Sequence, residues 1–334
     1  MVAWLKQKFA ILLLFSALVC IFSSCEKFVD SQVSEETFLL DTIIKITIYE
    51  GGSEEDIKEC FALCRKYEKM FSRTIENSEI SQINSRKISQ VSDETTELIK
   101  LALDCAELTE GAVDITIEPV SALWDFKSKP PALPNSEKIA EAVKHVGYEK
   151  VIQNGNTITF SDKYTRLDLG AIAKGYIADK LKEYLVSAGV TSAIINLGGN
   201  IQCIGQKSGK EKFGIGIQYP FKNESIAIAQ IADMSMVTSG IYERYFKIDD
   251  IIYHHLLNPQ TGLPVENNLL SVTIFCENSA IADALSTACF VLGYEKGFEL
   301  IDDLDYVHAA FITADNEVHL TRDFESHIDI SIIK

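Results

Sequence analysis

The sequence is poor in residues that mark several common protein classes. Of its 334 residues only seven are prolines and two are tryptophans, and 31 lysines and arginines stand against 48 aspartates and glutamates. The formal net charge of −17 would repel nucleic acid, so we expect no nucleic acid partner. The chain also has no CxxC pair, no Walker A loop and no G-x-G-x-x-G motif, which argues against a zinc ribbon and the common nucleotide-binding loops.

The chain is long enough for a sizeable core, because 47% of its residues are hydrophobic and no repeat or low-complexity tract interrupts it. We expect one large domain or two lobes. Most of the cysteines beyond the N-terminal segment have apolar neighbours and irregular spacing, so we expect them to be buried thiols. They are Cys60, Cys64, Cys105, Cys203, Cys276 and Cys289.

The first 24 residues have the pattern of an export signal. Two lysines precede an apolar run over 9–22 that is too short to span a bilayer comfortably. Ser23 and Ser24 then precede Cys25, as in a bacterial lipoprotein signal, although a plain secretory signal is the alternative. We expect a signal peptide over 1–24, a tether over 25–34 and one domain over 35–334. The protein would then be anchored through lipidated Cys25 to the cell membrane on its periplasmic side.

The stretch 166–200 has the most informative pattern. It predicts an extended segment with Asp168, a turn at Gly170, an amphipathic helix over 171–188, a strand over 193–197 and a glycine loop. Lys174 falls in the first turn of that helix, where free N–H groups and the helix dipole favour an anion. The pattern fits a phosphate site or an ordinary capped helix, and it does not decide between them.

Other segments predict further elements. Residues 36–49 alternate and are β-branched, which predicts a strand, and helices are expected from Ser53 and over 92–110. An extended segment is expected over 111–119. Its Asp114 would either face a ligand or bind backbone N–H groups at a turn.

The C-terminal third contains two candidate sites. Adjacent His254 and His255 on a strand point to opposite faces, so at most one can face a given site, as a general base or as a structural residue. A small and apolar helix over 278–293 places Asp283 and Thr287 on one face. Their oxygens suit Mg²⁺, but a dipole-favoured aspartate and a backbone-bonded threonine explain them equally well.

Several motifs in the same order resemble those of the ApbE family, the FAD:protein FMN transferases. The resemblance runs from about residue 40 to residue 321 and implies an α+β fold of two intimately packed α/β lobes with largely antiparallel or mixed sheets. The motifs are MFSRTIENSEISQIN (70–84), GAVDIT (111–116), DLGAIAKGY (168–176), NLGGN (196–200), TSGIYERYF (238–246), YHHLLNPQTGLP (253–264) and ADALSTACFVLG (282–293).

The resemblance also implies a reaction. FAD and Mg²⁺ would be used to transfer FMN through a phosphoester bond to a threonine or serine of acceptor flavoproteins in membrane redox complexes, with release of AMP. The metal would be held by the Ala171 carbonyl, Asp283 and Thr287, with His255 and Asp283 as catalytic residues. The implied FAD contacts are Leu40, Ile75, Ala112, Val113, Asp114, Asp168, Lys174 and His255.

The chain departs from the family pattern at three places. Leu40-Asp41-Thr42 stands where Met-Gly-Thr is usual, Ile75 where an aromatic residue commonly covers FAD, and Asn258 where Asp is usual. Two alternative functions use the same residues: a Mg²⁺-dependent FAD pyrophosphatase that yields FMN and AMP, and a non-catalytic flavin-binding lipoprotein.

We expect Cys25→Ser to release the protein from the membrane fraction, because this residue would carry the lipid anchor. Cell fractionation measures the outcome. Cys20→Ser is the matched control, since Cys20 follows Val19 rather than a small residue and should leave the protein at the membrane. A wild-type protein that is already soluble in the periplasm would contradict the prediction.

Overall fold

The computed structural model describes residues 32–207, 209 and 211–333. The predicted signal peptide and lipidated Cys25 lie outside these residues. From Gln32 onward the chain forms one compact unit. In the part of the chain that the structure describes, every helix is too short or too polar to cross a membrane.

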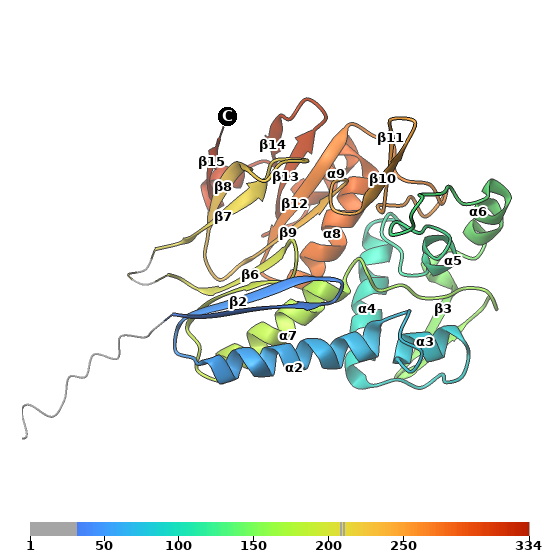
Figure 1. Cartoon of the computed structure of the whole chain (residues 1–334), viewed down its shortest axis with the longest axis horizontal. Helices are drawn as coiled ribbons and strands as arrows, with labels where there is room; N and C mark the ends of the chain where they lie inside the picture. The colour runs from blue at the N-terminus through green and yellow to red at the C-terminus, as the bar shows by residue number, and fades with distance from the viewer. Residues whose placement is uncertain (1–31, 208, 210, 334) are drawn as a thin grey trace, which may run out of the picture. The chain divides into compact units, whose positions relative to one another are not determined.

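The central element is an antiparallel sheet of eight strands in the order β1-β2-β5-β6-β9-β12-β13-β14, which confirms the expected α+β fold (Figure 1). All seven neighbouring pairs are antiparallel. The strands are β1 (Val33–Leu39), β2 (Thr42–Glu50), β5 (Ser192–Asn196), β6 (Asn200–Gly205), β9 (Ser235–Gly240), β12 (Leu269–Cys276), β13 (His308–Thr313) and β14 (Val318–Leu320).

Three helices cover one face of this sheet: α2 (Glu54–Phe71), α7 (Ala173–Ser187) and α8 (Ser279–Leu292). Ile44, Ile46 and Ile48 alternate along β2 and are fully or almost fully buried in the core shared with α2 and α7. This is the alternation expected of a strand with one face against a core. In Figure 1, α2 and α7 lie side by side along β2.

A second, three-stranded antiparallel sheet covers the opposite face through its own apolar cluster. Tyr49 of β2 packs on Phe213 of β7, with ring centroids 5.4 Å apart. The face of β2 that carries Tyr49 is therefore the face away from the helices. The strands are β7 (Phe213–Gln218), β8 (Ser225–Ile231) and β15 (Asp329–Ile332), in the order β15-β8-β7.

The remaining elements lie around these layers, and their aromatic residues form a smaller cluster in which Trp124 and Phe246 stack with centroids 6.4 Å apart. They are α3 (Glu79–Asn84), α4 (Asp93–Leu108), α5 (Glu118–Ser121), α6 (Ser136–Val143), η1 (Tyr148–Lys150), β3 (Val151–Asn154), β4 (Thr157–Phe160), β10 (Tyr245–Ile248), β11 (Ile251–His254), α9 (Tyr294–Asp302) and α10 (Phe324–His327).

The helices expected from Ser53, over 92–110, over 171–188 and over 278–293 are confirmed as α2, α4, α7 and α8. The structure shows why α8 begins and α7 ends where they do. The Asn278 side chain accepts a hydrogen bond from the N–H of Ile281, and Gly189 follows α7 with φ of 97°. All six cysteines of the described residues are buried and free, as expected.

Two expectations about extended segments are wrong. Residues 36–49 are not one strand, because β1 and β2 form a hairpin whose two-residue turn, Leu40-Asp41, has φ of 54° and 61°. Such turns favour Asn and Gly, so the sequence carried no signal for this one. The expected extended segment over 111–119 consists of turns followed by the start of α5. The Asp114 carboxylate stabilises those turns by accepting hydrogen bonds from nearby donors.

Helices α7 and α8 cross closely at Gly175. A Cβ on Gly175 would lie 2.2 Å from the carbonyl oxygen of Ser279 and 2.6 Å from the Cα of Ala280, so no larger residue fits. Asp179, one turn further along α7, accepts hydrogen bonds from the N–H groups of Ser279 and Ala280, both at 2.9 Å. The crossing therefore fixes the start of α8 against the start of α7.

We expect Gly175→Ala to destabilise the protein by about 1–3 kcal/mol, because overpacking against a backbone cannot be relieved by a rotamer change. The loss should outweigh the gain of about 1 kcal/mol in helix propensity from replacing glycine. Chemical denaturation measures the free energy of unfolding. Gly214→Ala is the matched control, since its Cβ would meet the flexible end of the Gln230 side chain at 3.2 Å and Ile228 Cγ2 at an ordinary contact distance of 3.5 Å. Equal stability of the two variants would contradict the prediction.

Candidate functional site

The crossing of α7 and α8 places Asp283 beside the first turn of α7. The Asp283 carboxylate is 4% exposed, and its Oδ2 accepts a hydrogen bond from the Gly175 N–H at 2.9 Å. Burial raises the pKa of this carboxyl, while the charge of Lys174 and the Gly175 N–H oppose the rise. Among the described residues, Gly175 supplies the one hydrogen bond to the carboxylate. A cation is the partner that would compensate such a buried acid.

Hydroxyl groups lie along the same side of α8. The Ser286 Oγ donates to the Asp283 carbonyl at 2.9 Å and lies 2.7 Å from the Ser239 Oγ of β9. Thr287 Oγ1 lies 3.3 Å from the same Ser239 Oγ. One carboxylate and several hydroxyl oxygens are hard ligands of the kind that Mg²⁺ takes. Ala171, the third predicted metal ligand, lies in the turn that immediately precedes α7.

Among the described residues there is no group of three or more His, Cys, Asp or Glu side chains that could hold a metal ion. The predicted set of Ala171, Asp283 and Thr287 contains one carboxylate only. It is therefore an oxygen site completed by a carbonyl and a hydroxyl, which is compatible with Mg²⁺ and not with a zinc site of histidines and cysteines.

Sequence reasoning missed Glu243, which follows β9 and faces the same centre. Burial raises the pKa of its carboxyl, Lys174 lowers it and Asp283 raises it. Glu243 nevertheless has an exposed surface, so the group of residues around Lys174 is open to solvent on this side. Its Oε1 would be 3.2 Å from a Cβ on Gly199, in the glycine loop between β5 and β6. The signal was present in the TSGIYERYF motif, but its glutamate was not singled out.

The two adjacent histidines differ in environment, as the strand geometry predicts. His254 is 5% exposed, its Nε2 lies 3.1 Å from the Val265 carbonyl, and burial lowers its pKa to about 4. His255 keeps some accessible surface, and its Nδ1 lies 3.3 Å from the Arg244 carbonyl. Burial, then the charges of Arg244 and Lys174, lower the pKa of His255 to about 3. His255 is thus the histidine on the Lys174 side.

Asp168 forms a separate charged cluster just before α7. Its Oδ2 lies 2.9 Å from Arg73 Nε and accepts a hydrogen bond from Ser121 Oγ at 2.7 Å. Glu118 lies beside it, 4.0 Å from Arg73 Nη1, and burial raises the pKa of its carboxyl. Arg73 and Glu118 were not predicted, because nothing in their spacing along the chain indicates that they meet Asp168.

The Ala112–Asp114 segment is buried, and the Asp114 side chain is engaged by its own turn. One oxygen accepts hydrogen bonds from the N–H and hydroxyl of Thr116 at 2.8 and 2.6 Å, and the other from the Tyr148 N–H at 2.8 Å. This is the arrangement of the alternative considered for Asp114, a carboxylate that stabilises a turn. Ala112 and Val113 are 8% and 4% exposed, so little of their side chains is accessible.

Leu40 and Ile75 both lie at the C-terminal end of α2. The Leu40 N–H donates to Glu68 Oε1 at 3.1 Å, and the Ile75 N–H donates to Ser72 Oγ at 3.2 Å. Ile75 is 36% exposed. The two departures from the family pattern therefore lie near the same end of α2, although they are 35 positions apart in the sequence.

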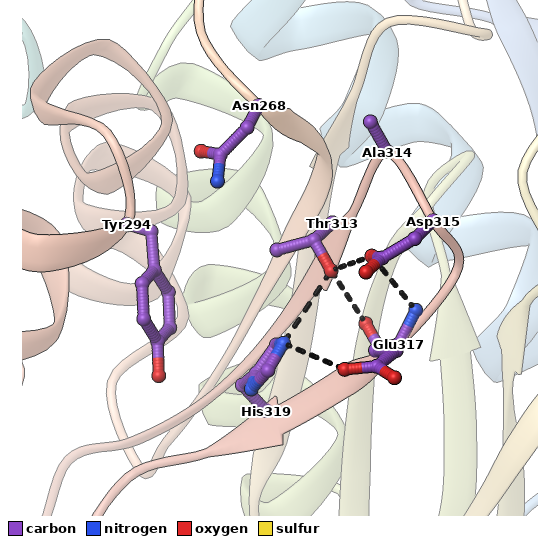
Figure 2. A pocket seen from close by; sticks show the side chains of 7 residues that line it. All are labelled: Asn268, Tyr294, Thr313, Ala314, Asp315, Glu317 and His319. Carbon is purple, nitrogen blue, oxygen red and sulfur yellow. Dashed lines mark hydrogen bonds and ion pairs between the residues drawn. The ribbon is translucent and has the colours of Figure 1, made fainter.

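Two cavities lie away from the predicted site residues. Figure 2 shows the larger, of about 410 Å³, between the start of α9 and the β13–β14 turn. It is lined by Asn268, Tyr294, Thr313, Ala314, Asp315, Glu317 and His319. The smaller, of about 290 Å³, lies beside β7 and includes Tyr49 and Phe213. Neither cavity contains a predicted metal or FAD ligand.

Known proteins are similar to this chain over most of its length. The family model described as the ApbE family matches residues 40–312. A protein of Treponema pallidum named FAD:protein FMN transferase is 31% identical over 311 residues, covering 86% of each chain. A protein of the same name from Klebsiella pneumoniae is 32% identical over 300 residues, covering 87% of this chain and 93% of its own.

Solved structures agree with this match. The crystal structure of the ApbE protein from Thermotoga maritima has a TM-score of 0.82 at 31% identity, and it covers 89% of this chain and 99% of its own. The flavin transferase ApbE from Vibrio cholerae has a TM-score of 0.79 at 26% identity, with the same coverage. The fold, the order of motifs and the grouping of Lys174, Asp283 and His255 all agree with one conclusion: the chain belongs to the ApbE family.

Proposed function

We propose that this protein is an FAD:protein FMN transferase, an enzyme that moves the FMN half of FAD to a threonine or serine hydroxyl of an acceptor protein and releases AMP. The names of its relatives support the transferase activity. The observation that carries the proposal is that the Asp283 carboxylate contacts the first turn of α7 at Gly175, with Glu243 and His255 also within electrostatic reach of Lys174. The products and the hydroxyl acceptor follow from the chemistry of splitting a pyrophosphate.

The start of α7 is suited to the pyrophosphate of FAD. Lys174 is the second residue of the helix, where its own charge and the helix dipole favour an anion. The chain as a whole carries a charge of −17. The positive charge of Lys174 therefore has to offset the negative charges of both the pyrophosphate and the nearby carboxylates. Lys174 would thereby orient the phosphorus atom that is attacked.

The oxygen set at α8 fits a divalent cation. Asp283 is a buried carboxylate with one hydrogen bond among the described residues, and the Thr287 hydroxyl lies on the same helix face one turn away. Asp283, Thr287 and the Ala171 carbonyl would hold Mg²⁺. When bound, Mg²⁺ would offset the charge that builds up on the phosphate oxygens during transfer.

His255 is positioned to accept the proton of the acceptor hydroxyl. Its Nδ1 can donate to the Arg244 carbonyl at 3.3 Å, which leaves Nε2 with a free lone pair. In the transfer, the hydroxyl proton goes to Nε2 and the hydroxyl oxygen bonds to the phosphorus of the FMN half. The bond from that phosphorus to the bridging oxygen breaks, and AMP leaves with that oxygen.

The direct test incubates purified protein with FAD, Mg²⁺ and a candidate acceptor flavoprotein. Flavin fluorescence of the denatured acceptor on a gel supports the transferase. Free FMN and AMP with an unlabelled acceptor would indicate a pyrophosphatase, and unchanged FAD would indicate a flavin-binding protein without catalysis. We also propose that the acceptors are exported or membrane-bound redox proteins, since the sequence predicts an anchor at Cys25.

We expect Asp283→Asn to lower turnover by about 100-fold or more, because the amide cannot offset the metal charge. The amide oxygen can still accept from the Gly175 N–H, so the fold should be retained. Because burial raises the pKa of Asp283, loss of the charge should not lower Tm without Mg²⁺. Added Mg²⁺ should raise the Tm of the wild type and leave that of the variant unchanged.

The matched control is Asp179→Asn, which alters a buried acid whose pKa burial raises to about 6 and which binds the start of α8. It should lower Tm, because the two Asp179 oxygens each accept a backbone N–H and an amide can accept only one of them, and it should keep the response to Mg²⁺. Near-normal turnover in Asp283→Asn would contradict the assignment of Asp283 as a metal ligand.

We expect the kcat/KM of the wild type to show no acid limb that depends on His255 as pH falls through 6.5, the ordinary pKa of histidine. The pKa of His255 is lowered to about 3, so the imidazole stays neutral and able to accept a proton above that pH. His255→Gln should reduce kcat by about 10²- to 10⁴-fold with little change in FAD affinity.

A pH–rate profile and an FAD titration measure these outcomes. His254→Gln is the control, since His254 bonds the Val265 carbonyl in the interior and should affect stability instead. An acid limb centred at pH 6.5 that disappears in His255→Gln would contradict the expected depression of the pKa.

A further inference from the structure

Two aromatic side chains near Glu243 and His255 are exposed to solvent. Phe221, in the β7–β8 turn, is 43% exposed and Tyr245, at the start of β10, is 37% exposed. Their ring centroids lie 5.5 Å apart at an interplanar angle of 89°. Phe221 has φ of 61°, in the left-handed region that is unfavourable for a bulky residue. The fold therefore holds the Phe221 ring at the surface, against Tyr245, at an energetic cost.

The aromatic pair is linked directly to the catalytic groups through the chain. Glu243, Arg244 and Tyr245 are consecutive: the first faces Lys174, and the carbonyl of the second contacts His255 Nδ1 at 3.3 Å. Tyr245 pairs with His254, the neighbour of His255, in the β10–β11 ladder. The aromatic pair therefore adjoins the segment that contacts His255, on a side where Glu243 and Tyr245 are exposed.

We propose that Phe221 and Tyr245 bind the acceptor protein, by packing on an apolar residue next to the hydroxyl that receives FMN. This inference rests on the proposed function and names the surface that the second substrate uses. Exposed aromatic side chains in fixed positions are the usual anchors of protein interfaces, because they contribute large contact areas with few rotatable bonds to immobilise.

A second exposed apolar pair points to a protein rather than to a ring of FAD. Phe38 and Ile43 lie opposite each other in the β1–β2 hairpin and are 68% and 62% exposed. Ile43 alternates with the helix-facing Ile44, so it faces the side that carries the three-stranded sheet. Strands β5 and β6 separate β2 from β9, the strand that precedes the Glu243–Tyr245 segment, so these two strands lie about 14 Å apart at ~4.8 Å per strand. One flavin or adenine ring cannot cover both pairs, whereas a protein surface can.

Charged residues lie between the Phe38–Ile43 pair and the Phe221–Tyr245 pair. Asp41, at the tip of the β1–β2 hairpin, lies 2.9 Å from the Lys127 ammonium, and its pKa is lowered by Lys127 and also by the charge of Arg244. Thr42 follows Asp41 and lies against Gly198 of the glycine loop. One continuous edge is therefore formed by the hairpin tip, the glycine loop and the Glu243–Tyr245 segment.

The test compares the wild type with the double variant Phe221→Ala/Tyr245→Ala, using a purified acceptor flavoprotein that the wild type flavinylates. We expect the KM for the acceptor to rise at least tenfold, with an unchanged Kd for FAD by fluorescence titration. Phe38→Ala/Ile43→Ala should raise the same KM. Tyr306→Ala is the matched control, because that aromatic is 82% exposed and lies outside this edge, and it should change neither constant.

The outcomes separate this inference from the proposed function. An active wild type and a double variant with an unchanged acceptor KM would overturn the inference alone. A raised Kd for FAD with an unchanged acceptor KM would assign the aromatic pair to FAD and would also overturn it. A wild type that flavinylates no acceptor would overturn the proposed function, and the inference with it. The Tm values of the double variant and of the single variant Tyr245→Ala are measured as well, so that a raised KM caused by unfolding is recognised.

Discussion

The close crossing of α7 and α8 at Gly175 is the contact on which the rest of the site depends. A Cβ there would meet the Ser279 carbonyl at 2.2 Å, and only glycine lets the Gly175 N–H reach the Asp283 carboxylate. One backbone contact therefore places a buried acid against the positive start of a helix. The same crossing brings Lys174 within electrostatic reach of Asp283, although the two are over 100 positions apart in the sequence.

The site concentrates a few positive charges in an acidic protein. Burial raises the pKa values of Asp283 and Glu243, and the Lys174 charge opposes both shifts. Burial, together with the charges of Arg244 and Lys174, lowers the pKa of His255 and keeps it neutral. Among the described residues the buried acids and the histidine receive only part of the compensation for their burial, and our proposal is that an additional anion and an additional cation supply the rest. A dinucleotide pyrophosphate and a divalent metal would supply that compensation together.

Local sequence signals predicted the elements of the site better than its contacts. The caps at Asn278 and Gly189 fixed the ends of α8 and α7, and strand alternation predicted that His254 and His255 face different sides. Glu243 and the Arg73–Asp168 ion pair were missed, because they depend on segments that meet only in the folded chain. Asp114 had two interpretations, and three local donors now account for its carboxylate.

By itself the sequence determined helices α2, α4, α7 and α8, strand β5, the buried thiols and the residue types able to bind phosphate and metal. These follow from periodicity, capping and side-chain chemistry, which act over a few neighbouring residues. Tertiary structure alone decided which groups converge. It placed Asp283 beside Lys174, turned residues 36–49 into a hairpin at Leu40-Asp41, and put Phe221 against Tyr245. Such contacts arise from the close packing of distant segments, for which no short sequence pattern exists.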